Sequence, residues 1–189
     1  MTTAHTKTLP LVRGPSTSPR PTGEVAVVDA ADWETWAKFL TWRPEYSRCD
    51  GKTRAYTTGS DRQKWYLHRI IMQPPKGMDI DHLSGDTLDN RRTNLRVCTR
   101  SQNCMNRIAK RNGRSAFKGV HFLRYKTTNY IQAQIRVNGR LIHLGTFKTQ
   151  EDAARAYDEA ARTHFGEFAR LNFPAKGEQP AENTRWWPR

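Results

Sequence analysis

The chain has 189 residues, enough for one ordinary domain or two small ones, and its net charge of +14 is extreme for that size. No run of about 18 apolar residues is present, which excludes a membrane-spanning helix, and we expect no membrane partner. The three cysteines form no CxxC pair, which excludes a disulfide framework and a zinc ribbon. Because the start of the chain also lacks an apolar export segment, we expect a cytoplasmic protein that is not secreted.

Residues 1–24 are rich in Pro, Ser, Thr and Gly, and this composition predicts a flexible tail. The next stretch combines a β-branched run with Trp33 and Trp36 at helical spacing, followed by Phe39 and Leu40. Tryptophans can stack on nucleic-acid bases, but this spacing favours packing into a core.

Residues 78–110 predict a strand, a long polar loop, a second strand and a helix. The segments are "MDIDH", then "LSGDTLDNRRT", then the alternating "NLRV", and finally "RSQNCMNRIAK" with Thr99 as its cap.

Positively charged residues dominate the sequence from residue 90 to residue 150. Between Asn90 and Gln150 there are fourteen Lys or Arg and no Asp or Glu. Solvated surfaces usually mix both signs, so this stretch predicts a polyanionic partner.

A short basic linker over residues 111–115 precedes a region with a different pattern, residues 116–174. "AFKGVHFLR", "NYIQAQIRVNG" and "RLIHLGTF" predict three strands, with a hairpin turn at Asn138-Gly139.

A helix is predicted after these strands. Thr149 and Asp152 form a capping box at its start, and Gly166 can end it. Its apolar stripe consists of Ala153, Ala156, Tyr157, Ala160 and Ala161. Residues 175–189 are predicted to be a loose tail.

Asp81, His82 and Asn103 are the residue types that phosphodiester cleavage needs. A minimal nuclease uses a base to activate water and one hard divalent ion, held by few protein oxygen ligands. His82 is the candidate base near pH 7, and Asp81 with the amide of Asn103 can hold one Mg²⁺ or Mn²⁺ per active site. Taken singly, each residue is more often structural. Arginines nearby can clamp the phosphate. The candidates are Arg91, Arg92 and Arg96.

The spacing Asp81-His82, eleven residues, Asn94, eight residues, Asn103 resembles the HNH nucleases, in the His-Asn-Asn variant of phage and intron homing endonucleases. The resemblance covers roughly residues 25–110 and implies a ββα-metal finger. In such a finger His82 would be the general base, Asp81 and Asn103 the metal ligands, and Asn94 a brace for the loop that helps to orient the histidine.

"YLHRIIM" belongs to the same resemblance and would place His68 and Arg69 near the substrate phosphates. The zinc-binding CxxC pairs of some members of the family are missing, so no structural zinc is expected.

Residues 116–174 resemble the DNA-binding domain of plant ethylene-response factors, the apetala family, through "FKGV", "AQIRVNGRLIHLGTF", "EDAARAYDEAA" and "LNFP". The resemblance implies a three-stranded antiparallel sheet packed on one helix, with its other face in the major groove of double-stranded DNA. The predicted contacts are Lys118, His121, Gln132, Gln134, Arg136, Arg140 and His143. Plant members usually carry Arg, Trp and Glu on this face, so their target sequence is not expected to apply.

We therefore predict an α+β protein in which a ββα-metal nuclease finger precedes a three-stranded sheet packed on one helix. The predicted function is that of a phage-type homing endonuclease that depends on a metal ion and is targeted by its second domain. One alternative is a DNA-binding transcription regulator on an inactive nuclease scaffold. Another is an RNA-binding protein, for which stacking aromatics would be expected on the sheet face.

Overall fold

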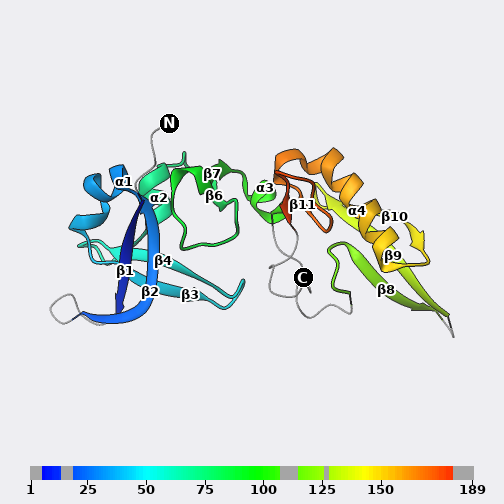
Figure 1. The fold of residues 1–189 in the computed structure, drawn as a ribbon, viewed down its shortest axis with the longest axis horizontal. Helices are drawn as coiled ribbons and strands as arrows, with labels where there is room; N and C mark the ends of the chain where they lie inside the picture. The colour runs from blue at the N-terminus through cyan, green and yellow to red at the C-terminus, as the bar shows by residue number, and fades with distance from the viewer. Residues whose placement is uncertain (1–5, 14–18, 107–114, 126–127, 181–189) are drawn as a thin grey trace. The chain divides into compact units, whose positions relative to one another are not determined.

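The computed structural model describes residues 6–13, 19–106, 115–125 and 128–180. The chain forms two compact units, Met1–Thr99 and Arg100–Arg189, and each unit has its own core (Figure 1). As predicted, the fold mixes helices with small, mostly antiparallel sheets. Among the described residues, no helix is long and apolar enough to cross a membrane.

The first unit begins with a hairpin of β1 (Thr6–Arg13) and β2 (Arg20–Asp29). This corrects the prediction of a flexible tail for residues 6–13 and 20–24, while residues 1–5 and 14–18 lie outside the described part of the chain. Leu9 and Leu11 point to one face of β1 and are 3% and 0% exposed, so they belong to the core of the unit. The alternation of buried leucines with exposed residues in β1 was missed, because Pro, Ser and Thr outnumber the leucines in this segment.

The tryptophan-rich stretch is only partly core. α1 (Ala30–Thr35) and the 3-10 turn η1 (Ala37–Phe39) replace the single helix that the spacing predicts. Trp33 packs against the core, whereas Trp36 and Phe39 are 39% and 70% exposed. The fully buried tryptophan is Trp42, which follows η1 and donates its Nε1–H to the carbonyl of Ala37 at 2.9 Å.

A three-stranded antiparallel sheet follows, in the order β3 (Arg43–Ser47), β4 (Lys52–Thr58), β5 (Lys64–Tyr66). α2 (Leu67–Met72) comes directly after β5 and buries Leu67 and Ile71 in the same core as the β1–β2 hairpin. The β1–β2 hairpin and α2 therefore share one core with the segment that carries the predicted site, through Ile80 and Leu95.

The predicted order of strand, loop, strand and helix is confirmed. β6 (Asp79–His82) pairs with β7 (Leu95–Cys98), the 3-10 turn η2 (Arg92–Asn94) ends the loop between them, and α3 (Arg100–Met105) follows. The remainder of the predicted helix and residues 111–114 of the predicted linker lie outside the described residues.

The second unit contains the predicted sheet and helix. β8 (Val120–Tyr125), β9 (Thr128–Val137) and β10 (Arg140–Phe147) form an antiparallel sheet with β9 in the centre, and α4 (Gln150–Phe165) packs on it (Figure 1). Asn138 and Gly139 both have positive φ, 49° and 79°, as the predicted hairpin turn requires. Thr149 accepts the amide of Asp152 at 3.1 Å, which confirms the cap.

Residues 175–180 are more ordered than predicted. After the 3-10 turn η3 (Gly166–Phe168), β11 (Arg170–Leu171) pairs in parallel with β12 (Gln179–Pro180). Arg162 on α4 binds both carboxylate oxygens of Glu178, at 2.8 and 2.9 Å, and so attaches this segment to the helix. This corrects the prediction of a loose tail over residues 175–180. Residues 181–189 lie outside the described part of the chain.

The sequence motifs "FKGV" and "LNFP" each contain a residue that joins the sheet to α4. Gly119 has φ +77°, and a Cβ built on it would lie 1.9 Å from Cδ2 of Tyr157. Asn172 joins the segment before β8 to α4. Its Oδ1 accepts the amide of Lys118 at 2.7 Å and its Nδ2 donates to the buried Asp158 at 3.0 Å. The sheet and the helix are therefore joined by close packing at Gly119 and by hydrogen bonds at Asn172.

Gly119→Ala should lower the free energy of unfolding by roughly 3 kcal/mol or more, because the new methyl group overlaps the Tyr157 ring and the backbone is left-handed. Gly139→Ala is the matched control. Its φ is also positive, but its Cβ would meet nothing within 4 Å, so a loss of only ~1 kcal/mol is expected. Urea denaturation followed by circular dichroism measures both losses, and equal losses would contradict the packing account.

Candidate functional site

The β6–β7 hairpin carries two of the predicted catalytic residues. Asp81 lies opposite Arg96 in the register, and His82 lies opposite Leu95. Asp81 and His82 are 5% and 6% exposed, so both polar side chains are held inside the protein. Neighbouring residues of a strand point to opposite faces, which puts the carboxylate and the imidazole on different sides of the hairpin.

Arg96 binds Asp81 across the hairpin. Its Nε and Nη2 both donate to Oδ2 of Asp81, at 2.9 and 2.7 Å, and both side chains are largely covered. A well-covered pair of this kind holds the carboxylate in one orientation. The sequence predicts Arg96 as a DNA contact, whereas the structure gives its guanidinium a partner within the hairpin.

His82 is surrounded by a second histidine and an asparagine. Its Nε2 lies 3.4 Å from Oδ1 of Asn90, and the His68 ring meets its ring edge-on, with centroids 5.3 Å apart. Burial lowers the pKa of His82 to about 4 and the pKa of His68 to about 3, so both imidazoles are neutral near pH 7. A neutral imidazole is the state in which a general base accepts a proton.

His68 is predicted to lie near the substrate phosphates, but the structure buries it. Its ring stacks on Tyr66 with centroids 5.7 Å apart, and the hydroxyl of Tyr66 donates to Glu45. A neutral ring that is only 9% exposed is poorly placed to contact a phosphate. In the structure, the His68 ring has the rings of Tyr66 and His82 as neighbours, and no phosphate contact is needed to explain its position.

Asn94 braces the loop between β6 and β7. Its Oδ1 accepts the amide of Ser84 at 2.8 Å, and its Nδ2 donates to the carbonyl of Asp89 at 2.7 Å, so one side chain holds both ends of the loop. Asn90 is 1% exposed and supplies the oxygen that faces His82. The sequence places Asn90 only within the predicted polar loop, and its contact with His82 is missed because asparagine is common in loops and turns for other reasons.

The other predicted phosphate contacts of this unit are Arg69, Arg91 and Arg92. Arg69 is exposed on α2. Arg91 donates to both carboxylate oxygens of Asp89, at 2.8 and 2.5 Å, and Arg92 donates to both oxygens of Asp32, at 2.9 and 2.8 Å. The Arg91 and Arg92 side chains therefore brace the loop, although both stay partly open to solvent.

Asn103 lies on α3, in the second unit, and its place beside Asp81 stays a prediction. No three His, Cys, Asp or Glu side chains of the described ranges are grouped as a metal site would group them. A site made from one carboxylate and one amide would not form such a group.

The outer face of the β8–β9–β10 sheet, the face turned away from α4, carries five of the seven predicted DNA contacts. They are His121, Gln132, Gln134, Arg136 and His143. Gln132 lies opposite His121 and Gln134 opposite His143, and directly paired residues share a face. Ala133, between the two glutamines, is fully buried on the other face. β9 therefore has a core face and an outer face, as the resemblance to a sheet packed on one helix implies.

Lys118 and Arg140 do not belong to that face, and their contacts with DNA stay predictions. Lys118 comes before β8 and donates its Nζ to the carbonyl of Met105 at 2.7 Å, near the ring of Tyr157. Arg140 lies opposite Val137, whose side chain packs against the core. The two-residue turn makes these strand ends a direct pair, so Arg140 takes the face of Val137.

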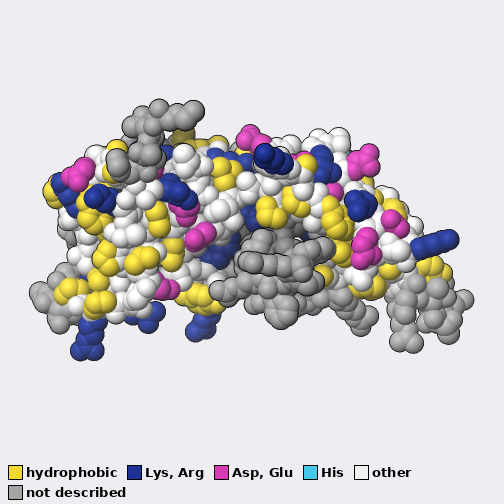
Figure 2. Space-filling model, in the orientation of Figure 1, with side chains coloured by type: hydrophobic (Ala, Val, Ile, Leu, Met, Phe, Trp, Pro, Cys, Tyr) yellow, Lys and Arg dark blue, Asp and Glu magenta, His cyan; other side chains and the backbone are white. Residues whose placement is uncertain are grey.

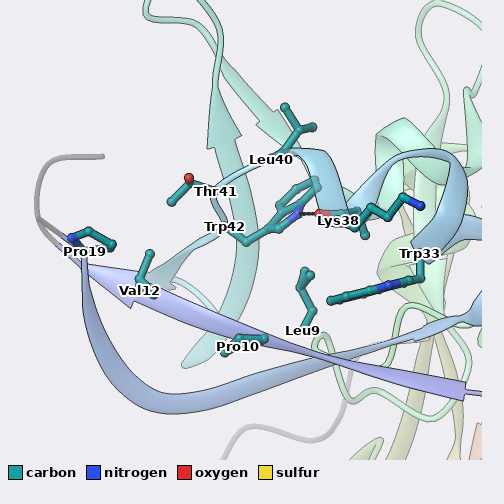
Figure 3. A pocket seen from close by; sticks show the side chains of 10 residues that line it. Leu9, Pro10, Val12, Pro19, Trp33, Lys38, Leu40, Thr41 and Trp42 are labelled. Atoms are coloured by element: carbon teal, nitrogen blue, oxygen red, sulfur yellow. Dashed lines mark hydrogen bonds between the residues drawn. The ribbon is translucent and has the colours of Figure 1, made fainter. Parts of the chain in front are cut away.

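A hollow of roughly 250 Å³ in the first unit lies between β1 and the α1–η1 segment, lined by Leu9, Trp33, Leu40 and Trp42 among others (Figure 3). None of the predicted site residues lines it. Hydrophobic side chains interspersed with charged ones are common on the visible surface (Figure 2), so its apolar lining alone does not mark it as a site.

Comparison with known proteins shows that the candidate residues lie in a segment that matches a known protein family. The profile of the HNH endonuclease family matches residues 66–105, which include Asp81, His82, Asn94 and Asn103. An uncharacterized HNH endonuclease of Acanthamoeba polyphaga mimivirus is 30% identical over 156 residues, which cover 79% of this chain and 75% of that protein. An alignment of that length is longer than either unit, so it includes residues of both.

Plant proteins match a shorter stretch. Dehydration-responsive element-binding protein 2A of Arabidopsis thaliana is 41% identical over 75 residues, 39% of this chain and 22% of that protein. The putative dehydration-responsive element-binding protein 2H of the same plant is 43% identical over 65 residues, 33% of this chain and 40% of that protein. The chain thus spans less than half the length of these plant relatives.

Asn94→Ala should speed hydrogen exchange at the Ser84 amide by about tenfold or more, because that amide and the Asp89 carbonyl both lose their partner. Exchange measured by NMR gives this rate directly. Amides of β9, in the other unit, serve as the internal control and should not change. An unchanged rate at Ser84 would show that the loop is held by other contacts.

Burial lowers the pKa of Lys118 to about 8, against 10.5 for an ordinary lysine. A lowered lysine pKa in the folded state adds stability above the ordinary value, and this stability is lost as the pH falls through about 8. The free energy of unfolding should therefore rise between about pH 8 and pH 10. Lys118→Met should flatten this rise, whereas Lys148→Met, at an exposed position, should not. Identical slopes in both variants would refute the assignment.

Proposed function

The chain belongs to the HNH endonuclease family, and we propose that it is a metal-dependent DNA endonuclease whose second unit binds the duplex. The observation that carries the proposal is the hairpin that holds the neutral His82 next to Asp81, with its loop braced by Asn94. The buried base and the braced loop support hydrolysis of a phosphodiester bond.

In the proposed reaction His82 accepts a proton from the attacking water. Asn90 offers its Oδ1 to Nε2 of the ring, and an oxygen acceptor there places the ring proton on Nε2. The lone pair then lies on Nδ1, which becomes the basic nitrogen. The edge-on His68 limits rotation of the ring, since the two centroids are only 5.3 Å apart.

Asp81 and Asn103 would hold the ion in the ββα-metal arrangement that we propose. Arg96 fixes the orientation of the carboxylate through two hydrogen bonds to one of its oxygens. A carboxylate with an amide oxygen is a hard donor set without thiolate, and it fits Mg²⁺ or Mn²⁺. Such an ion, when bound, stabilises negative charge on the phosphate and the leaving oxygen.

The second unit would supply affinity and some sequence preference. Its outer sheet face carries Gln, Arg and His without a carboxylate, which suits the major groove of double-stranded DNA. We propose that residues 116–174 form the DNA-binding domain, which we call the DNA reader. The proposed nuclease keeps residues 25–110 and adds β1 with the start of β2, because Leu9 and Leu11 of β1 belong to its core. The proposed role is that of a free-standing homing enzyme of phage type, acting in the cytoplasm of its host.

His82→Ala should abolish cleavage of supercoiled plasmid in Mg²⁺ while binding, measured by gel shift in chelator, stays within about twofold of wild type. The matched control is His164→Ala, an exposed histidine at the end of α4, which should cleave normally. Wild-type protein should produce no nicked or linear plasmid in chelator.

Equal loss of cleavage and binding in His82→Ala would contradict the assignment of the base. Wild-type protein that binds DNA but never cleaves it would favour a regulator on an inactive scaffold.

A further inference from the structure

The outer face of the β8–β9–β10 sheet also carries three exposed apolar side chains that the predicted contacts leave out. Leu123, Tyr130 and Leu141 are 48%, 41% and 55% exposed. Leu123 lies directly opposite Tyr130, and Leu141 directly opposite Arg136, so all three share the face of the polar contacts. One exposed leucine needs no explanation, but two leucines and a tyrosine on a face of Gln, His and Arg have the composition of an interface.

The charge of the region defines the partner of this face. It lies within the stretch from Asn90 to Gln150 that contains fourteen Lys or Arg and no acidic residue, so an acidic polymer is favoured over a protein of mixed charge. The partner must also offer apolar groups to the leucines. The C5-methyl of thymine is the apolar group that a nucleic acid presents in its major groove.

The same chemistry distinguishes DNA from RNA. Uracil lacks the methyl group, and the major groove of an RNA helix is too narrow for side chains to read. A single-stranded partner would call for several stacking Phe, Tyr or Trp side chains, whereas Tyr130 is the one such residue among the described side chains of this face.

We propose that Leu141 at one end of the outer face, and the Leu123–Tyr130 pair at the other, contact thymine methyl groups. This inference rests on the proposal that the second unit reads duplex DNA. Tyr130 and Arg136 are six residues apart on β9, which is roughly 20 Å along a strand. That span is shorter than one turn of the duplex, about 34 Å, so both thymines lie within one turn. Between them the glutamines and histidines face base edges.

The test begins with selection of the preferred duplex from a random DNA library by the full chain, in chelator so that nothing is cut. Each thymine of the selected site is then replaced by uracil, which removes only the methyl group. At two positions within one turn this replacement should weaken wild-type binding by about three- to tenfold. Leu141→Ala should lose the sensitivity at one position and Leu123→Ala at the other.

Ile142→Ala is the matched control, because Ile142 follows Leu141 but lies opposite Ile135 on the core face. It should keep both uracil effects, and circular dichroism checks that each variant folds. A selected site without thymine, or one in which uracil has no effect, would overturn the inference and leave the DNA reader intact. Tighter binding to an RNA duplex of the same sequence would also overturn it. Failure to bind any duplex would instead refute the reader itself.

Discussion

The loop between β6 and β7 is held by hydrogen bonds from distant parts of the first unit as well as by its own asparagine. The amide of Val27 donates to the carbonyl of Leu88 at 2.8 Å, and the carbonyl of Val27 accepts the amide of Asn90 at 2.7 Å. Thr87 donates to the carbonyl of Thr53 at 2.5 Å. The family profile begins at residue 66, so β2 and β4 lie outside it. In this chain they nevertheless fix the loop that presents Asn90 to His82, and the N-terminal strands are therefore part of the site's support.

Burial and pairing give the two units different electrostatic roles. In the first unit three arginines near the site bind Asp81, Asp89 and Asp32, so much of their charge is already compensated. In the second unit the outer sheet face has no carboxylate to compensate Arg136. Electrostatic attraction to a phosphate backbone is sequence-independent and strong, and the second unit is the better source of it. In the first unit, burial keeps His82 neutral near pH 7, and Arg96 orients the carboxylate of Asp81.

The order of elements around the site and the architecture of the second unit were predictable, because both depend on local patterns. Alternation in β9, the Asn138-Gly139 turn and the cap at Thr149 each act within a few residues. Features that depend on distant contacts were not predictable. Leu11 becomes core only by pairing with β2 and packing on later strands, and Asn90 meets His82 only because β2 holds the loop. The spacing of the motif was enough to predict which residues belong to the site. The carboxylate partners of Arg91, Arg92 and Arg96 could be identified only from the folded structure.

The central proposal is that Asp81 and Asn103 would hold one hard divalent ion close to a neutral His82. The most direct test is a crystal structure of the His82→Ala protein with duplex DNA and Mn²⁺, in which anomalous scattering locates the ion. The account predicts one Mn²⁺ per chain, ligated by a carboxylate oxygen of Asp81, the amide oxygen of Asn103 and a phosphate oxygen, with water molecules in the remaining positions. An ion bound elsewhere, or Asp81 and Asn103 both remote from any ion while DNA is bound, would contradict the account.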